Sequence, residues 1–268
     1  METVPFAPRR ECRPGADHSV VYVETERIGQ LTVVKISRSP VNAITLELAT
    51  EIALAFKSAI ESRAKAIVLT GLDGYFSAGV DLKEVPTYTS EQQASMVTAI
   101  NQLVAMVYGC PKPVVGAISG HAIAGGLVVA LCCDHRVGAE GDFKLGLTEA
   151  KAGVPFPAAA LEVARKELMP AAARQLVLAN RLISPDEALA MGVLDELVPL
   201  EWMRERSTEV AQELSKIPPE TFARTKAALR GDALTYMRRI IETRADPALH
   251  GWLSDETASA AAKLLQKK

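Results

Sequence analysis

The sequence predicts an α/β fold in which strands and helices alternate, followed by a helical C-terminal region. Runs of β-branched residues between glycines and prolines alternate with stretches whose apolar residues recur at helical spacing. From about residue 157 the composition becomes alanine-rich and favours helix. The chain has 268 residues, of which 49% are hydrophobic, enough to fill a large core. These observations indicate successive strand, strand, helix turns of chain rather than a sandwich.

The first half of this core begins with the stretch VVYVETERIGQLTVVKIS, residues 20–37, which predicts two strands around a turn at residues 27–30. An apolar stripe at helical spacing predicts a helix over residues 44–61. The stretch AKAIVLTG then predicts a short buried strand, and FSAGVDLKEV, residues 76–85, a loop. This order repeats in the next segment of the chain.

The second half predicts a helix over residues 90–109, a strand in KPVVGAISG, a glycine turn leading into a helix at 125–133, and a strand in HRVGAE. The helical stretch that follows is interrupted near Ser184-Pro185, Gly192 and Pro218-Pro219. We therefore expect a flexible tail over residues 1–18, a core over 19–200 and a helical C-terminal module over 201–268.

Charge and cysteine content argue against nucleic acid, anionic membranes and metal ions as binding partners. The formal charge is -2 and the isoelectric point about 6.1, so a general attraction to nucleic acid or an anionic membrane is not expected. The four cysteines, Cys12, Cys110, Cys132 and Cys133, lack the C-x-x-C spacing of a metal site and are interpreted as buried thiols. The N-terminal stretch has no apolar segment like that of a signal peptide, so we expect a cytoplasmic protein.

Two glycine loops carry the first indication of chemistry. Gly79 lets the backbone approach a ligand closely and leaves the amide of Val80 in a fixed position. Gly125 and Gly126 open a predicted helix, where free amides gather and stabilise negative charge. Either loop alone is equally well explained as a tight turn, but together they favour a shared oxyanion hole.

These loops resemble the crotonase, or enoyl-CoA hydratase/isomerase, superfamily over about residues 20–268. The most specific segments are FSAGVDLKE, then KPVVGAISGHAIAGG followed by CCDHRV, and ALAMGVLDELVP. The resemblance implies a crotonase-like spiral of ββα units. It also implies that the amides of Val80 and Gly125 hold the thioester carbonyl of an acyl-CoA. The backbone that would contact the CoA portion comprises Ser77, Ala78, Gly79, Val80, Asp81 and Leu82.

The resemblance also identifies the acid. Hydratases of the family carry one glutamate at the position of Val128 and a second about twenty residues later, where this chain has Glu149 in KLGLTEAKAGVP. The Δ3,Δ2-enoyl-CoA isomerase branch is similar in having a single glutamate here, and the closing SDETASAAAKLLQKK also looks like that branch. An apolar pocket, to which Leu127, Val128 and Val129 would contribute, would raise the pKa of Glu149 toward neutrality.

Other interpretations of these residues remain open. Glu149 could instead be a carboxylate at a helix start. His121 and His135 have no aspartate, serine or cysteine at a triad spacing, and we do not expect either to be catalytic. Asp134 and Arg136 suggest a buried ion pair, and Asp81 is expected to hold its own loop.

The resulting expectation is an acyl-CoA isomerase that moves a double bond from the 3- to the 2-position, with Glu149 as the proton carrier. Enoyl-CoA hydration or another enolate reaction is the first alternative, and a non-catalytic binding protein of the same fold is the second. We expect no metal and no cofactor other than the coenzyme A of the substrate. By the same resemblance, the helical region 201–268 would assemble the chain into trimers or hexamers.

Overall fold

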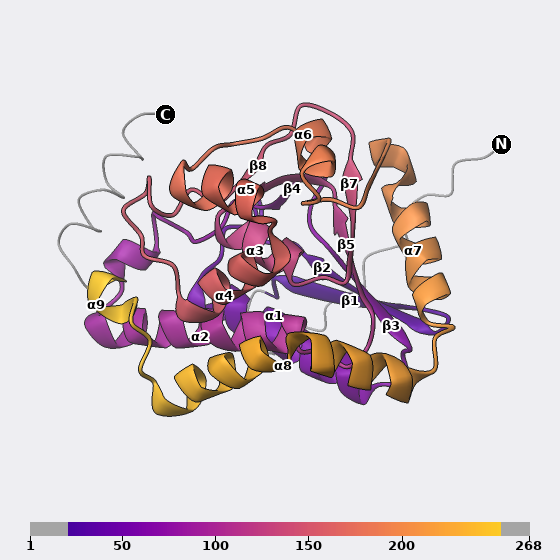
Figure 1. The fold of residues 1–268 in the computed structure, drawn as a ribbon, viewed down its shortest axis with the longest axis horizontal. Helices are drawn as coiled ribbons and strands as arrows, with labels where there is room; N and C mark the ends of the chain where they lie inside the picture. Colours follow the sequence, from indigo (N-terminus) through magenta and orange to yellow (C-terminus); the bar gives the residue numbers. More distant parts are fainter. Residues whose placement is uncertain (1–20, 253–268) are drawn as a thin grey trace, which may run out of the picture.

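A six-stranded sheet forms the centre of the computed structural model, which describes residues 21–252 (Figure 1). Its first two strands are antiparallel, and every later neighbour is parallel, so the chain must cross over between strands. The strands lie in the order β1 (Val23–Ile28), β2 (Leu31–Ile36), β3 (Ala66–Thr70), β5 (Val114–Ile118), β7 (His135–Ala139) and β9 (Glu196–Val198).

A second, smaller sheet lies beside the first. Its three strands are parallel and run in the order β4 (Gly74–Ser77), β6 (Gly120–Ile123) and β8 (Leu145–Gly146). Each one follows a strand of the large sheet within a few residues along the chain, so two consecutive strands belong to two different sheets. This arrangement confirms the α/β class and the repeated strand, strand, helix order.

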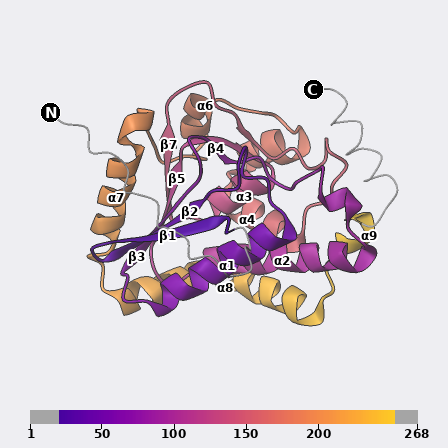
Figure 2. The ribbon, with the colours of Figure 1, turned by 180° about the vertical axis from the view of Figure 1, so that it is seen from behind.

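Helices cover both faces of the large sheet (Figures 1 and 2). Helix α7 (Met203–Leu214) packs on one face through Met203, Val210 and Ala211. The main core fills the other face, beneath α1 (Leu46–Glu61), α2 (Ser90–Tyr108), α3 (Gly125–Leu131) and α4 (Ala158–Glu167). The remaining helices are α5 (Pro170–Ala173), α6 (Pro185–Ala190), α8 (Pro219–Thr243) and α9 (Leu249–Trp252), with short helical turns η1 (Val85–Thr87), η2 (Arg174–Leu178) and η3 (Leu200–Trp202).

Local sequence explains where these helices begin. Thr45 caps α1 by accepting a hydrogen bond from the amide of Leu48. Thr89 and Gln92 cap α2 reciprocally, and Ser184 and Glu187 do the same for α6. Because α2 is fixed at its start, its buried face, which includes Ile100, Leu103 and Val104, is directed at the core and at the cavity described below.

The observed elements agree with the predicted ones for the long segments and differ for the short ones. Strands β4 and β6 occupy stretches that were predicted as loop and glycine turn, and β9 interrupts the region predicted as helical. Residues 1–18, the closing SDETASAAAKLLQKK and Cys12 lie outside the described residues. Helix α7, which follows residue 200, packs on the same large sheet as the core. The division into a core over 19–200 and a helical module over 201–268 stays a prediction.

None of the helices within residues 21–252 is both long enough and apolar enough to cross a lipid bilayer.

Candidate active site

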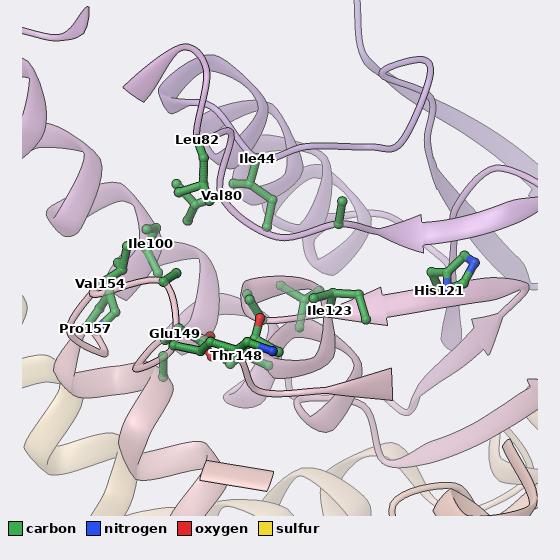
Figure 3. A pocket seen from close by; sticks show the side chains of 18 of the residues that line it. Ile44, Val80, Leu82, Ile100, His121, Ile123, Thr148, Glu149, Val154 and Pro157 are labelled. Atoms are coloured by element: carbon green, nitrogen blue, oxygen red, sulfur yellow. The ribbon is translucent and has the colours of Figure 1, made fainter. Parts of the chain in front are cut away.

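A cavity of about 480 Å³ lies where the two glycine loops meet α2, α3 and the turn after β8 (Figure 3). Figure 3 shows Val80, Ile44 and Leu82 on one wall and Glu149 and Thr148 on the facing wall. His121 lies at one end of the view, and Ile100, Val154 and Pro157 lie at the other. Apolar side chains provide most of the lining. Such a site suits a largely hydrocarbon ligand.

Two backbone amides point to the chemistry of this cavity. The amide of Val80 donates no hydrogen bond to the described part of the chain, because the bridge to Ile44 uses Gly79 O and the amide of Asp81 instead. The amide of Gly125 opens α3 and therefore has no partner within the helix. A Cβ built on Gly125 would lie 4.0 Å from the nitrogen of Val80, so the two residues border the same small space.

Glycine is needed at two positions to bring the loops this close. Gly79 has a φ of +79°, and a Cβ there would lie 2.8 Å from the carbonyl oxygen of Ile123. A Cβ on Gly126 would lie 2.3 Å from the carbonyl oxygen of Ser77, so only glycine lets α3 pack against β4. Ala124 has a φ of +50°, an uncommon conformation for a residue with a side chain, at the turn that presents Gly125.

Glu149 is the only carboxylate among the described residues that line the cavity. Only 7% of its surface is exposed, and its Oε2 accepts no hydrogen bond from the described residues. Burial raises the pKa of this carboxyl from its ordinary value of 4.5 to about 7, although a hydrogen bond from its own backbone acts in the opposite direction. The site therefore holds a carboxyl that can both take and return a proton near neutral pH.

The surroundings of Glu149 argue against its alternative interpretation and differ in one respect from the expected pocket. The residue lies in a turn between β8 and α4, which begins only at Ala158, so it is not a carboxylate at a helix start. Val128 and Val129 line the cavity, as expected, but Leu127 is buried in the core away from it. The amide of Val154 donates to the carbonyl of Glu149 at 2.9 Å and closes the turn that holds the side chain.

The predicted binding loop, residues 77–82, divides into lining residues and supporting residues. Ala78, Val80 and Leu82 line the cavity, as does Gly125. Ser77 instead donates a hydrogen bond to the carbonyl of Asn42 at 2.7 Å, and it accepts one from the amide of Gly79. Asp81 pairs with Arg38 at 2.8 Å and accepts from the amides of Lys83 and Glu84, as expected for a carboxylate that holds its own loop. Contact of any of these residues with CoA stays a prediction.

The two histidines near α3 have separate surroundings. His121 lines the cavity, accepts a hydrogen bond from the amide of Lys144 through Nδ1, and contacts the tilted ring of Tyr75 with ring centroids 4.8 Å apart. His135 pairs with Glu196 at 3.0 Å on the large sheet. Neither forms a triad with a nucleophile. Within residues 21–252, no group of three His, Cys, Asp or Glu side chains is arranged to hold a metal ion.

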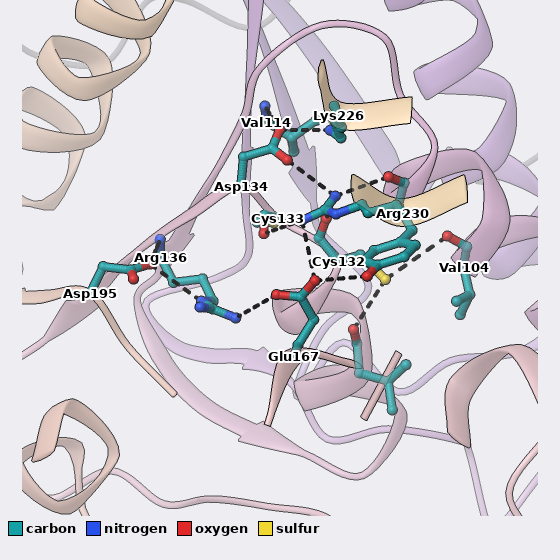
Figure 4. A network of polar contacts seen from close by, with 12 residues as sticks. Val104, Val114, Cys132, Cys133, Asp134, Arg136, Glu167, Asp195, Lys226 and Arg230 are labelled. Carbon is teal, nitrogen blue, oxygen red and sulfur yellow. Dashed lines mark hydrogen bonds and ion pairs between the residues drawn. The ribbon is translucent and has the colours of Figure 1, made fainter. Parts of the chain in front are cut away.

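A buried network of charges lies behind α3 and corrects one prediction (Figure 4). Asp134 and Arg136 do not pair with each other. Asp134 pairs with Lys226 at 2.6 Å and Arg230 at 3.1 Å, both on α8. Arg136 contacts two other carboxylates, those of Asp195 at 3.3 Å and Glu167 at 3.7 Å. This network fixes α8 to the core and does not reach the cavity.

The apolar end of the cavity contains residues that sequence reasoning did not identify. Ile100 and Leu103 come from α2, Val154 and Pro157 from the segment after Glu149, and Trp252 from α9. Buried residues at helical spacing in α2 indicate a core face, but spacing alone does not tell which of them border a cavity. Trp252 carries no sequence signal of this kind, because it lies more than a hundred residues after Glu149.

Comparison with known proteins agrees with this geometry. Residues 26–258 match the family model described as enoyl-CoA hydratase/isomerase. The mouse protein named enoyl-CoA delta isomerase 1, mitochondrial, is 31% identical over 228 residues, which cover 83% of this chain and 79% of that protein. A Mycobacterium tuberculosis protein named probable enoyl-CoA hydratase EchA17 is 30% identical over 212 residues, which cover 79% of this chain and 81% of that protein.

A solved structure shows the same arrangement of elements. The crystal structure of human mitochondrial delta3-delta2-enoyl-CoA isomerase superposes with a TM-score of 0.85 at 27% sequence identity. The match covers 92% of this chain and 97% of the human one. Relatives named as isomerases and relatives named as hydratases thus have similar sequence identity to this chain. A choice between the two activities therefore depends on the residues of the cavity.

Proposed function

The chain is an enzyme of the enoyl-CoA hydratase/isomerase family, and from this membership we propose that it is an isomerase that converts 3-enoyl-CoA to 2-enoyl-CoA. One observation carries the proposal. Among the residues that the structure describes, the cavity contains a single buried carboxylate, Glu149, and has valine at position 128. A double-bond shift needs one group that moves a proton, whereas holding a water across a double bond is the work of two.

In the proposed reaction, the Glu149 carboxylate removes a proton from C2 of the 3-enoyl-CoA. The electron pair of the C–H bond forms the C1–C2 double bond of a dienolate, and negative charge develops on the thioester oxygen. Protonated Glu149 then returns the proton to C4, the C2–C3 double bond forms, and the carbonyl is restored. The unpartnered Oε2 and the pKa of about 7 support this role, because the same group must act as base and then as acid.

The amides of Val80 and Gly125 are proposed to stabilise the dienolate oxygen. Both amides border one space and donate to no described group there, so they cost no rearrangement when charge develops. Donors of this kind typically contribute about 3 kcal/mol each to the stabilisation of a transition state. The largely apolar lining strengthens their effect by excluding water.

Two substitutions test the assignment of isomerase. Glu149→Gln keeps the shape of the side chain but cannot carry the proton, so isomerisation of 3-enoyl-CoA should fall at least about a thousandfold while acyl-CoA binding persists. Val128→Glu places a second carboxylate on the cavity wall and should introduce measurable hydration of 2-enoyl-CoA. The absorbance of the conjugated thioester follows both reactions, rising on isomerisation and falling on hydration.

Glu140→Gln is the matched control, because Glu140 is exposed and lies outside the cavity. This variant should isomerise at the wild-type rate. A wild-type protein that hydrates 2-enoyl-CoA faster than it isomerises 3-enoyl-CoA would replace the isomerase assignment with that of a hydratase. If Glu149→Gln kept both the isomerisation and any hydration activity of the wild type, Glu149 would have no part in the mechanism.

The remaining expectations belong to the same proposal. The only cofactor required is the coenzyme A that forms part of the substrate, since the chemistry is a transfer of one proton within one molecule. We propose a cytoplasmic location for this chain, whereas the name of the mouse relative places that protein in mitochondria. Fractionation of cells that express the tagged chain would decide between these locations.

A further inference from the structure

The two ends of the cavity differ in chemistry. Figure 3 shows His121 at one end and Ile100, Val154 and Pro157 at the other. Of the remaining lining residues, Tyr75 and Lys144 contact His121, and Trp252 bonds to Pro155, next to Val154. An acyl-CoA has a charged nucleotide portion on one side of its thioester and a hydrocarbon chain on the other. Since hydrocarbon gains most from apolar surroundings, the second end suits the acyl chain.

Trp252 lies at the boundary of this apolar end. Its side chain is almost entirely buried, with 4% of the residue exposed, and it belongs to both the cavity lining and the hydrophobic core. The indole N–H donates a hydrogen bond to the carbonyl of Pro155 at 2.8 Å. A Cβ added to the preceding Gly251 would lie 2.4 Å from Cγ of Pro155, so α9 sits directly on the segment that follows Glu149.

A buried carboxylate holds the surrounding elements together. Asp246 accepts hydrogen bonds from the side chain of Asn101 on α2 at 2.6 Å, from the amide of Ala158 at the start of α4 at 2.9 Å, and from the amide of Ala248 at 2.8 Å. Asn101 in turn accepts from the amide of Ala159 at 3.0 Å. These bonds connect α2, α4 and the start of α9, so the wall that carries Trp252 is fixed in place.

We propose that Trp252 is a specificity-determining residue that ends the acyl-chain subsite and thereby sets the longest chain that the cavity accommodates. The inference rests on the proposed function only in that the ligand is an acyl-CoA with a hydrocarbon chain. The rigid wall around α9 means that a longer chain finds the indole ring in its path. Replacement of the ring by a methyl group opens the cavity in the direction of α9.

Binding of saturated acyl-CoAs tests the proposal, because these ligands bind without reacting. Dissociation constants are measured by calorimetry for chains from butanoyl to hexadecanoyl. Each methylene that enters the apolar end should tighten binding by up to about fourfold, until the chain reaches Trp252 and the gain stops. In Trp252→Ala the gain should continue for at least two further carbons. Trp202→Ala is the matched control, since Trp202 is 53% exposed and outside the cavity, and it should leave the limit unchanged.

A second measurement keeps Trp252 in place and so does not depend on the stability of the alanine variant. The chain has two tryptophans, and Trp202→Phe leaves Trp252 as the only indole. Its fluorescence should change when an acyl chain long enough to reach it binds, and should change little with butanoyl-CoA. Trp252→Phe, which keeps a ring, should retain the wild-type length limit.

The outcomes separate this inference from the proposed function. An unchanged length limit in Trp252→Ala, or the same fluorescence change with every chain length, would overturn the role of Trp252. A limit that moves as expected in a protein that does not isomerise 3-enoyl-CoA would support the inference and reject the isomerase. Failure of every acyl-CoA to bind would reject both.

Discussion

The buried carboxyl of Glu149 lowers the stability of the fold but suits the proposed reaction. A carboxyl that is 7% exposed and lacks a partner for Oε2 loses the hydration it has in the unfolded chain. Burial destabilises the neutral form less than the ionised form, which is why it raises the pKa to about 7. The same environment that destabilises the ionised form gives the group a pKa suited to proton transfer near neutral pH.

Stability should therefore depend on pH through this residue. Because the folded pKa of about 7 exceeds the ordinary 4.5, the cost of Glu149 is absent below pH 4.5 and grows as pH rises to about 7. The difference corresponds to about 3 kcal/mol at most. Glu149→Gln should then be more stable than wild type at pH 8 and nearly equal to it at pH 4.5. Urea unfolding at both values measures this, and an equal difference at both would contradict it.

The rate should follow the same titration in the opposite sense. The first step needs the ionised carboxylate, so kcat/KM for isomerisation should rise about tenfold per pH unit below pH 7 and level off above it. The proposed mechanism requires no other group of the cavity to gain or lose a proton. Initial rates between pH 5 and 9 test this expectation, and a rate that falls through pH 7 would exclude Glu149 as the base.

The sequence predicted the position of this residue and a raised pKa, but not all of the elements that bury it. The segment KLGLTEAKAGVP identified Glu149 by resemblance, whereas its burial depends on α2, α3 and α9, which come from distant parts of the chain. The pairing of Asp134 with Arg136 was wrong for a related reason. The partners of Asp134 lie on α8, 92 residues or more away, and proximity in sequence could not indicate them.

At the scale of elements, the glycine pair at the start of α3 should respond unequally to substitution. Gly125→Val should fold, because a Cβ there meets only ordinary contacts at 3.5 Å or more, but its side chain would enter the space between the two amides. We expect a loss of at least about a hundredfold in kcat/KM. Gly126→Ala should instead destabilise the protein, because its Cβ would lie 2.3 Å from Ser77 O.

Circular dichroism melting and kcat/KM, measured on both variants, distinguish these effects. A folded and fully active Gly125→Val would disprove the oxyanion hole. Wild-type melting of Gly126→Ala would show that α3 does not need to pack so closely on β4.

Element length explains which parts of the fold were predictable. Helices α1 and α2 and strands β2 and β3 have enough residues for an apolar pattern to be visible. Strands β4, β6, β8 and β9 have two to four residues and are defined by parallel neighbours that the sequence does not reveal. Since β4 and β6 end at the two glycine loops, the loops were predictable from their residues but their meeting was not.

At the scale of the whole molecule, we expect a trimer or a hexamer. Several large apolar side chains remain exposed on the described monomer, including Met169 at 68%, Leu178 at 76% and Leu229 at 81%. Burial of such side chains between identical subunits would stabilise an assembly with closed symmetry. Light scattering at micromolar concentration should give three or six times the 28.7 kDa of one chain. A mass of 28.7 kDa across a dilution series would contradict the prediction.

The anchoring of α8 by buried charges sets an order for the biosynthesis of the protein. A ribosome produces residues 80–149, which contain the proposed catalytic groups, well before it produces Lys226 and Arg230. Until those cations arrive, Asp134 lacks the two counter-charges that it has among the described residues, and Glu167 lacks that of Arg230. Enclosing an acid without its partner is strongly unfavourable. We therefore expect the nascent chain to complete its core only after α8 has emerged, near the end of translation. A chain terminated before residue 226 would carry every proposed catalytic residue but lack these ion pairs.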